Sequence, residues 1–324
     1  MSLRGTAAAG LAAALAAVAL SSSGCLTGGY HSKPRVAVVD GDPIVQMSKP
    51  GVLPTLDHPG YAPFRRHSDR PFPDEKVVGL RLAGARAYPI GLLDGYEVIN
   101  DEAGGVPYVV ARCALTDYAG VLDRRVAGRT LTFDNSGALW RDMVVLRDRE
   151  TGTYWSPATG RALSGPLAGE RLRAIPAPLT TADAWEELYS DGVCLDTGDL
   201  TAVPLTLKLY AGSSWEGLSG HKSRDPRLPP KQRVFVVAEG SEAVAFTAAE
   251  LKKRKSVGVR LAEQAFLLEW DAAVRSPRAY RLETFGAREE RPVIPMFWFA
   301  ALRHFPGART LSEVAPGILT GSGP

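Results

Sequence analysis

From Lys76 onward, apolar and polar positions alternate in short runs that turn-forming residues separate. The run at residues 76–82 alternates and ends at Ala83-Gly84, and glycine-containing turns at residues 134–137 and 149–152 interrupt the later runs. Turns recur roughly every 8 to 15 residues, a spacing typical of β-sandwiches and barrel-like sheets. The pattern predicts a mainly β protein with a few short helices.

Residues 94–116 contain the densest set of reactive side chains in the chain. Two apolar runs flank Gly104-Gly105, which predicts a β-hairpin. The hairpin carries four of our candidate site residues, Tyr96, Glu97, Asp101 and Cys113. Trp155, further along, is the fifth.

The second half of the chain has a pattern like that of the first, which suggests two related β blocks and an internal duplication. The strand-like run at residues 76–82 resembles residues 233–240, and the segment from Ala184 resembles the segment from Phe297. Helices are predicted after the N-caps Thr181 and Thr247, the latter in a capping box with Glu250. The alternative is that two unrelated β meanders with a helix look alike.

The first 25 residues have the features of a targeting segment. Arg4 provides positive charge, residues 7–20 are an Ala/Leu run, and Ser22-Ser23-Gly24-Cys25 follows. That ending resembles a bacterial lipobox, which implies that Cys25 is lipidated. An ordinary cleaved signal peptide is the alternative. A membrane-spanning anchor is disfavoured, because the apolar run is shorter than the ~20 residues that a bilayer crossing needs. We therefore expect a lipid-anchored, periplasm-facing envelope protein or an exported one, and Leu26 after Cys25 favours the outer membrane.

Composition divides the rest of the chain into segments. We expect a Pro-rich tether and arm at residues 26–72 with a strand at residues 35–39, a first β block at 73–200 that carries the candidate site, a linker at 201–228, a second β block at 229–315 and a flexible tail at 316–324.

Charge and cysteine content narrow the range of partners. The net charge is +3 and the arginines are dispersed, so we expect no nucleic-acid partner. The lipid anchor would make the membrane one partner, and a protein or small-molecule partner is not specified.

Cys113 and Cys194 are 81 residues apart in a domain large enough to be stable without a disulfide, which favours two unpaired thiols. The five histidines show no metal-binding spacing.

Several segments together resemble a known family. They are residues 53–59, Ala87-Tyr88-Pro89, residues 96–101, Tyr154-Trp155-Ser156 and residues 165–169. The chain resembles the bacterial proteins catalogued as domain of unknown function 3179, over about residues 51–194 and more faintly to Phe305.

The resemblance implies a His-Glu-Ile-Val-Asn-Asp segment followed by Cys-Pro-Leu-Cys. Here Tyr96 replaces the histidine and Thr116 the second cysteine, while Cys113 remains. A histidine with a Cys-x-x-Cys motif implies a soft-metal or redox site in the members that keep it. The family has no established activity that could be transferred.

The expected strand geometry and burial limit the roles that each candidate residue can have. Cys113 shares a strand face with Val109 and Ala111, so a buried structural thiol competes with a ligand or redox role. Glu97 and Asp101 are expected on one strand face with Cα atoms ~13 Å apart. We expect Asp101 to cap the Gly-Gly turn, and Glu97 to pair with Arg86 or Arg112 if it is buried. Trp155 could form an aromatic surface with Trp140, Asp142 and Tyr154, or pack in the core.

Three functional hypotheses follow. The first is a non-catalytic binding or structural lipoprotein whose ancestral site is degenerate, with no cofactor. The second is a metal-binding or thiol-redox protein that uses a transition metal or the thiol of Cys113, with Glu97 and Tyr96. The third is an envelope hydrolase that uses Glu97 and Asp101 as acid and base.

Overall fold

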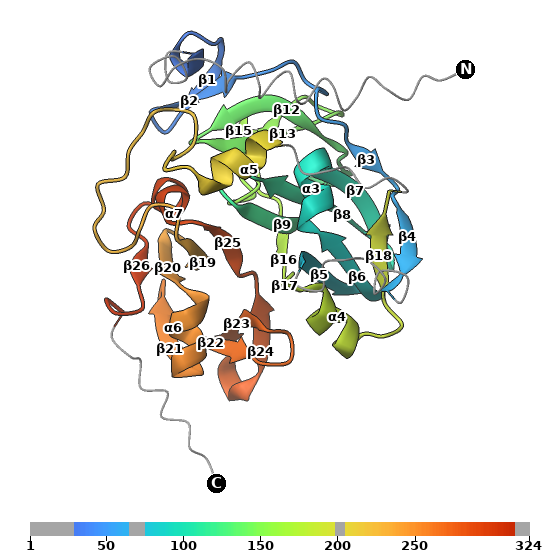
Figure 1. The fold of residues 1–324 in the computed structure, drawn as a ribbon, viewed down its shortest axis with the longest axis vertical. Coiled ribbons are helices and arrows are strands. Elements are labelled where there is room, and N and C mark those ends of the chain that lie inside the picture. Colours follow the sequence, from blue (N-terminus) through green and yellow to red (C-terminus); the bar gives the residue numbers. More distant parts are fainter. Residues whose placement is uncertain (1–28, 65–74, 198–204, 315–324) are drawn as a thin grey trace.

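Short strands make up most of the chain, as the alternating pattern predicted, and the fold is mainly β (Figure 1). The computed structural model describes residues 29–64, 75–197 and 205–314. The leader at 1–25 and the predicted tail at 316–324 lie outside these ranges.

The first block consists of two five-stranded sheets. One has the order β17 (Leu179–Thr181), β5 (Lys76–Leu82), β6 (Gly84–Pro89), β18 (Val193–Asp196) and β4 (Gly60–Pro63). The other, which we call the hairpin sheet, has the order β16 (Ala174–Ile175), β9 (Tyr118–Asp123), β8 (Val106–Cys113), β7 (Val98–Ala103) and β3 (Leu56–Asp57). The predicted hairpin is confirmed as β7 and β8, which pair from Val98↔Ala111 to Ala103↔Val106.

The second block consists of two four-stranded sheets. One has the order β25 (Ile294–Phe297), β19 (Arg233–Glu239), β20 (Glu242–Phe246) and β26 (Arg309–Thr310). The other has the order β21 (Ser256–Leu261), β22 (Gln264–Asp271), β23 (Ser276–Leu282) and β24 (Arg288–Arg291). Each of these two sheets repeats the strand order of one sheet in the first block. In the first sheet β19 takes the place of β5, and in the second β21 takes the place of β7.

A six-stranded sheet covers one end of the first block. Its order is β1 (Arg35–Val39), β2 (Asp42–Gln46), β12 (Phe133–Trp140), β13 (Met143–Asp148), β14 (Tyr154–Trp155) and β15 (Ala162–Ser164). A separate ribbon joins β10 (Arg125–Val126) to β11 (Arg129–Thr130).

Short helices connect the strands. They are α3 (Ile90–Tyr96), α4 (Ala182–Leu188), α5 (Leu205–Gly212), α6 (Ala248–Arg254), α7 (Trp298–His304) and the 3-10 turn η2 (Thr284–Gly286). Both predicted N-caps are confirmed: Thr181 accepts a hydrogen bond from Ala184 N and Thr247 from Glu250 N. None of the helices among residues 29–64, 75–197 and 205–314 is long and apolar enough to cross a membrane.

The predicted Pro-rich tether and arm at residues 26–72 contains more β-structure over residues 35–63 than the single expected strand. The strand predicted at residues 35–39 is present as β1, but β2, β3 and β4 also join sheets, through pairs with β12, β7 and β18. The prolines are compatible with this because Pro43 is the second residue of β2 and Pro63 ends the edge strand β4, near strand ends where a missing backbone N–H costs little.

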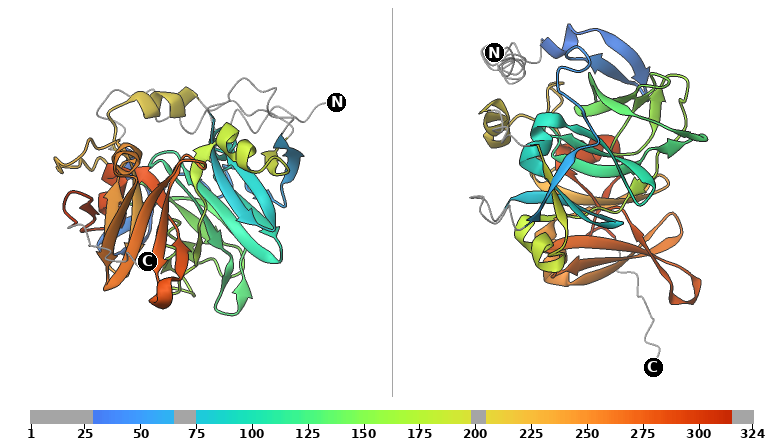
Figure 2. Two further views of the ribbon diagram at one scale, coloured as in Figure 1. Left: turned by 90° about the horizontal axis from the view of Figure 1, so that it is seen from below. Right: turned by 90° about the vertical axis from the view of Figure 1, so that its right-hand side faces the viewer.

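The two blocks share their apolar core. A first core cluster contains Leu80 and Ile99 of the first block together with Phe246 and Phe266 of the second. A second core cluster joins Val109 and Trp155 to Val236 and Trp298. Figure 2 shows the orange and red sheets packed directly against the cyan and green ones. The blocks therefore stabilise one another through buried apolar area.

Substitution of Gly79 tests how α4 packs on the sheet. The ring of Trp185, 1 % exposed, lies over this strand position, and a Cβ at Gly79 would lie 2.6 Å from it. We expect Gly79→Ala to lower the free energy of unfolding by about 1–3 kcal/mol in urea titrations, because an overpacked core must shift. Gly212→Ala, where the added carbon meets nothing within 4 Å, is the control and should be neutral or slightly stabilising. Equal effects of the two substitutions would contradict this packing.

Candidate functional site

Glu97 ends a helix and does not belong to a strand, which corrects the prediction. Its φ is 57°, its N–H bonds to Leu93 O at 2.8 Å, and its carbonyl accepts from Arg112 N at 2.8 Å. The sequence pattern does not predict the short helix α3, because its two glycines lower helix propensity. Since β7 begins one residue later, the alternation that would place Glu97 and Asp101 on one face does not apply.

The carboxyl group of Glu97 turns inward and meets Asn135. Asn135 Nδ2 donates to Glu97 Oε2 at 2.6 Å, while Asn135 Oδ1 accepts from Gly137 N at 2.8 Å. Burial and the neighbouring Asp94 carboxylate raise the pKa of Glu97 to about 8, although Arg112 and Asn135 act in the opposite direction. A protonated carboxyl group is therefore favoured at neutral pH.

Cys113 lies on the same side of the hairpin sheet as the Glu97 carboxyl group. It is 1 % exposed and packs with Val109 and Ala111 in the second core cluster, and Val144 N donates to its sulfur at 3.4 Å. Burial and nearby Glu97 raise the pKa of the Cys113 thiol. Cys113 and Cys194 are both buried, and they lie in different core clusters.

Asp101 lies in a separate polar cluster on the opposite face. Its Oδ2 accepts hydrogen bonds from four side chains, those of Tyr61, Tyr88 at 2.9 Å, Tyr108 at 2.7 Å and Arg86 at 2.6 Å. Although burial opposes it, donation from Tyr61 and Tyr108 holds the pKa of Asp101 below its usual range. Tyr88 and Tyr108 belong to the first core cluster, whereas Cys113 belongs to the second. The hairpin sheet thus separates the two candidate carboxylates.

The remaining predicted residues do not join either group. Trp155 is 0 % exposed, donates to Asp148 Oδ2 at 2.8 Å and contacts Phe133 edge to face, so it is part of the core. Tyr96 is the last residue of α3 and is half-buried. Cys25 lies outside the described residues.

A second buried network is centred on Arg112, and no sequence pattern predicts it. Its Nε donates to Asp94 at 2.8 Å and its Nη1 to Asp117 at 3.0 Å, and Asp117 also pairs with Arg233 of the second block. The sequence suggests Arg112 only as a partner for Glu97, because its observed partners are set by long-range pairing. Thr116 is 0 % exposed and its carbonyl accepts from Phe297 N at 2.7 Å.

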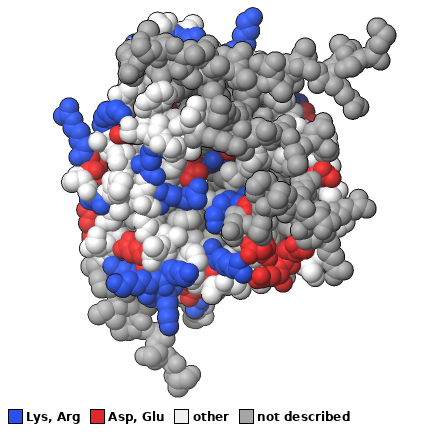
Figure 3. All heavy atoms as spheres, in the orientation of Figure 1, with Lys and Arg blue, Asp and Glu red and all other residues white. Residues whose placement is uncertain are grey.

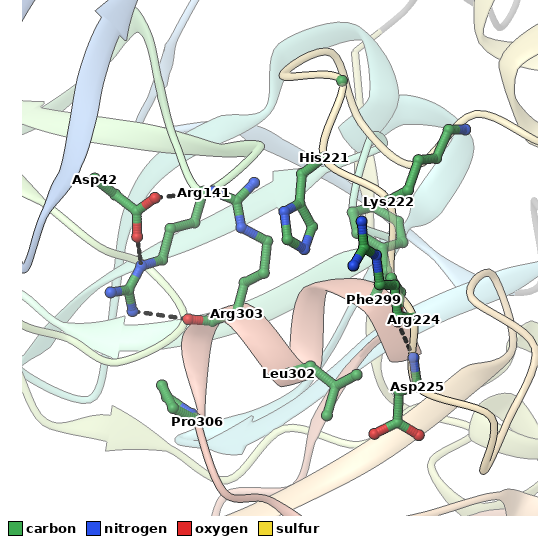
Figure 4. A pocket seen from close by; sticks show the side chains of 12 residues that line it. Asp42, Arg141, His221, Lys222, Arg224, Asp225, Phe299, Leu302, Arg303 and Pro306 are labelled. Carbon is green, nitrogen blue, oxygen red and sulfur yellow. Dashed lines mark hydrogen bonds and ion pairs between the residues drawn. The ribbon is translucent and has the colours of Figure 1, made fainter.

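An open groove of about 850 Å³ lies away from the hairpin, between α7, the turn after β12 and residues 220–225 (Figure 4). Phe299, Leu302 and Pro306 give it apolar walls, and five basic side chains line it, those of Arg141, His221, Lys222, Arg224 and Arg303. Arg141 and Arg303 are paired with Asp42, whereas Arg224 forms no ion pair within the part of the chain that the structure describes. On the face that Figure 3 shows, basic side chains are dispersed among acidic and uncharged ones.

Within residues 29–64, 75–197 and 205–314, no three His, Cys, Asp or Glu side chains come together in a way that could hold a metal ion. Glu97 and Cys113 are therefore not part of such a group in the described residues.

Comparison with known proteins places the chain in a family. The model of the protein family of unknown function DUF3179 matches residues 50–291. The chain belongs to this family. A search of the curated proteins and a search of the solved structures find no match. Membership of DUF3179 identifies the relationship and carries no activity with it.

The carboxyl group of Glu97 makes stability depend on pH. Because its pKa is about 8 in the folded chain and near 4.5 when unfolded, the folded state loses stability as pH rises between these values. Each pKa unit corresponds to about 1.4 kcal/mol, so the full difference amounts to about 5 kcal/mol. Glu97→Gln should match wild type near pH 4.5 and be more stable by up to that amount above pH 8. Urea unfolding at several pH values measures this. Glu263→Gln, whose side chain is 92 % exposed, is the control, and a constant difference for Glu97→Gln would contradict the assignment.

The hydrogen bonds that Asp101 accepts from three tyrosines and Arg86 make it a structural residue. Asp101→Asn leaves Arg86 without its anionic partner, and removing one member of a buried pair costs about 3–5 kcal/mol. We expect this loss at pH 7 and a smaller one as the pH falls below about 4, the ordinary pKa of an aspartate, and approaches the lower pKa of folded Asp101. Exposed Glu102→Gln, one residue away, should change the free energy of unfolding by less than about 0.5 kcal/mol.

Proposed function

We propose that the protein is a cell-envelope lipoprotein that acts by binding and not by catalysis, with its ancestral site retained as structural core. The burial of Cys113 carries this proposal. A thiol that is 1 % exposed, with a raised pKa, reacts poorly as a nucleophile or a metal ligand.

The location rests on the leader. Its charged start, its apolar run and the lipobox-like Ser22-Ser23-Gly24-Cys25 support export and lipidation at Cys25. Lipidation would leave the described residues beside a membrane surface. The open groove, and not the hairpin, is then the concave surface available to a ligand.

We propose further that the two blocks arose by duplication of one unit. Their matching strand orders support this, and so does the backbone at Lys255, which has a φ of 66° after α6. Lys255 N bonds to Leu251 O at 2.8 Å and its carbonyl accepts from Trp270 N at 2.8 Å, the same pattern as at Glu97. The left-handed backbone of Glu97 is thus explained by the architecture and requires no catalytic role.

The metal-binding or thiol-redox alternative retains one supporting observation, the nearness of the Glu97 carboxyl group to Cys113. A metal requires both groups deprotonated, and their raised pKa values oppose that. The hydrolase alternative is weaker, since Glu97 and Asp101 face opposite sides of the hairpin sheet.

Thiol accessibility and metal content test the proposal. In a Cys25→Ser chain, we expect a disulfide reagent to label Cys113 and Cys194 only after denaturation, and metal analysis to find no stoichiometric copper, zinc or iron. Cys194→Ala is the matched control for Cys113→Ala, because both thiols are buried and they lie in different clusters. Rapid labelling of native Cys113, or bound metal that only Cys113→Ala removes, would overturn the proposal.

A further inference from the structure

Helix α5 and the turn after it hold two apolar side chains at the surface. Leu209 is 61 % exposed and Trp215 is 39 % exposed. Between them, Tyr210 is 6 % exposed, donates to Leu115 O at 2.6 Å and accepts from Gly217 N at 3.0 Å. Tyr210 therefore fixes the helix on the body while Leu209 points outward.

Lys231 prevents the end of this helix from rearranging. Its ammonium group donates to the carbonyl oxygens of Tyr210, Ala211 and Ser213, and lies 4.0 Å from the centre of the Tyr210 ring. A helix C-terminus held by a cation is favoured by the helix dipole. The exposure of Leu209 and Trp215 is thus a stable property of the fold. The left view of Figure 2 shows α5 standing out from the sheets.

Cations without acidic partners surround this helix and the groove. Lys222 Nζ is 3.5 Å from Ser214 O, next to Trp215, and Arg224 follows in the groove wall. Both are exposed, as are Lys33 and Arg35 near the start of the described chain, and none of the four forms an ion pair with another described residue. Of the neighbouring acids, Asp142 is paired with Arg303 and Asp225 with Arg227, while buried Glu216 accepts a hydrogen bond from Ser223 N at 2.6 Å. Lys222 and Arg224 outnumber this one carboxylate, so the charge left over on this face is positive.

The N-terminal end of the described chain adjoins the same face. Tyr30 is buried, and burial together with the nearby Asp142 carboxylate raises its pKa to about 12, with Arg303, Asp42 and Arg35 also in electrostatic reach. Asp42 and Arg303 line the groove. Cys25 precedes Tyr30 by five residues, which span at most ~18 Å when fully extended. A lipid on Cys25 would hold this face close to the bilayer.

We propose that the face formed by α5, Trp215, Lys222 and Arg224 rests on an anionic lipid surface. This inference rests on the proposed lipid anchor at Cys25. Leu209 and Trp215 would enter the headgroup boundary, where aromatic and aliphatic side chains are stable, and the two cations would meet lipid phosphates. The anchor and the face together supply the two contacts that stable membrane association needs.

Fluorescence quenching tests the orientation directly. Since Cys113 and Cys194 are buried, a maleimide lipid can be attached at Cys25 alone in a chain that starts there. On vesicles of brominated phosphatidylglycerol, we expect tryptophan emission to be quenched and Trp215→Phe to remove most of that quenching. Four of the other tryptophans are buried: Trp140, Trp155, Trp185 and Trp298.

Phe285→Ser is the matched control. Phe285 is a fully exposed aromatic residue in η2, which directly precedes β24, and Figure 1 shows β24 near the bottom of the molecule, well below α5. Its loss should leave the quenching unchanged. Quenching that is absent, or equal with and without Trp215, would overturn the inference.

The charge contribution is measured with an unanchored Cys25→Ser chain. A cation near an anionic surface contributes about fivefold to partitioning, so Lys222→Gln with Arg224→Gln should weaken binding to phosphatidylglycerol vesicles tenfold or more. Lys252→Gln with Lys253→Gln removes two exposed charges from distant α6 and should have no effect. Equal losses in the two double variants would overturn a specific face. Thiol labelling in the absence of vesicles tests separately whether Cys113 is buried. The proposed function and the proposed membrane-facing surface can therefore be refuted independently.

Discussion

The buried guanidinium of Arg112 is the interaction on which most of the first block depends. With a side chain 7 % exposed, it can be accommodated only because Asp94 and Asp117 both accept hydrogen bonds from it. Asp94 belongs to α3 and Asp117 to the turn between β8 and β9, so one cation orients both segments. Asp117 extends the network to Arg233 of the second block.

This constraint also shapes the surroundings of Glu97. Arg112 N donates to the Glu97 carbonyl, while the Arg112 side chain is directed to the two aspartates. The Glu97 carboxyl group therefore receives a neutral amide from Asn135 and no direct salt bridge. A carboxyl group with that partner, beside a buried thiol, is easier to keep protonated than charged.

The hairpin sheet divides the polar interior into two groups that do not meet. On one face, three tyrosines and Arg86 satisfy Asp101, and on the other, Cys113 packs among apolar side chains near the Glu97 carboxyl group. Both groups use their hydrogen bonds internally, which leaves little capacity for a ligand. The surface with unused charge and unused apolar area lies elsewhere, around α5 and the groove.

Features that depend on residues close together in the chain could be predicted from the sequence. The two-residue period and the Gly104-Gly105 turn specify β7 and β8, the threonine caps specify the starts of α4 and α6, and the family motif identifies DUF3179. Each of these depends on neighbours a few residues apart. Tertiary structure alone decided that proline-rich residues 35–63 join three sheets, that α3 turns Glu97 off the strand, and which partner each carboxylate receives. Asp101 meets Tyr61 across 40 residues and Glu97 meets Asn135 across 38, and such pairings follow from sheet order, which no local pattern encodes.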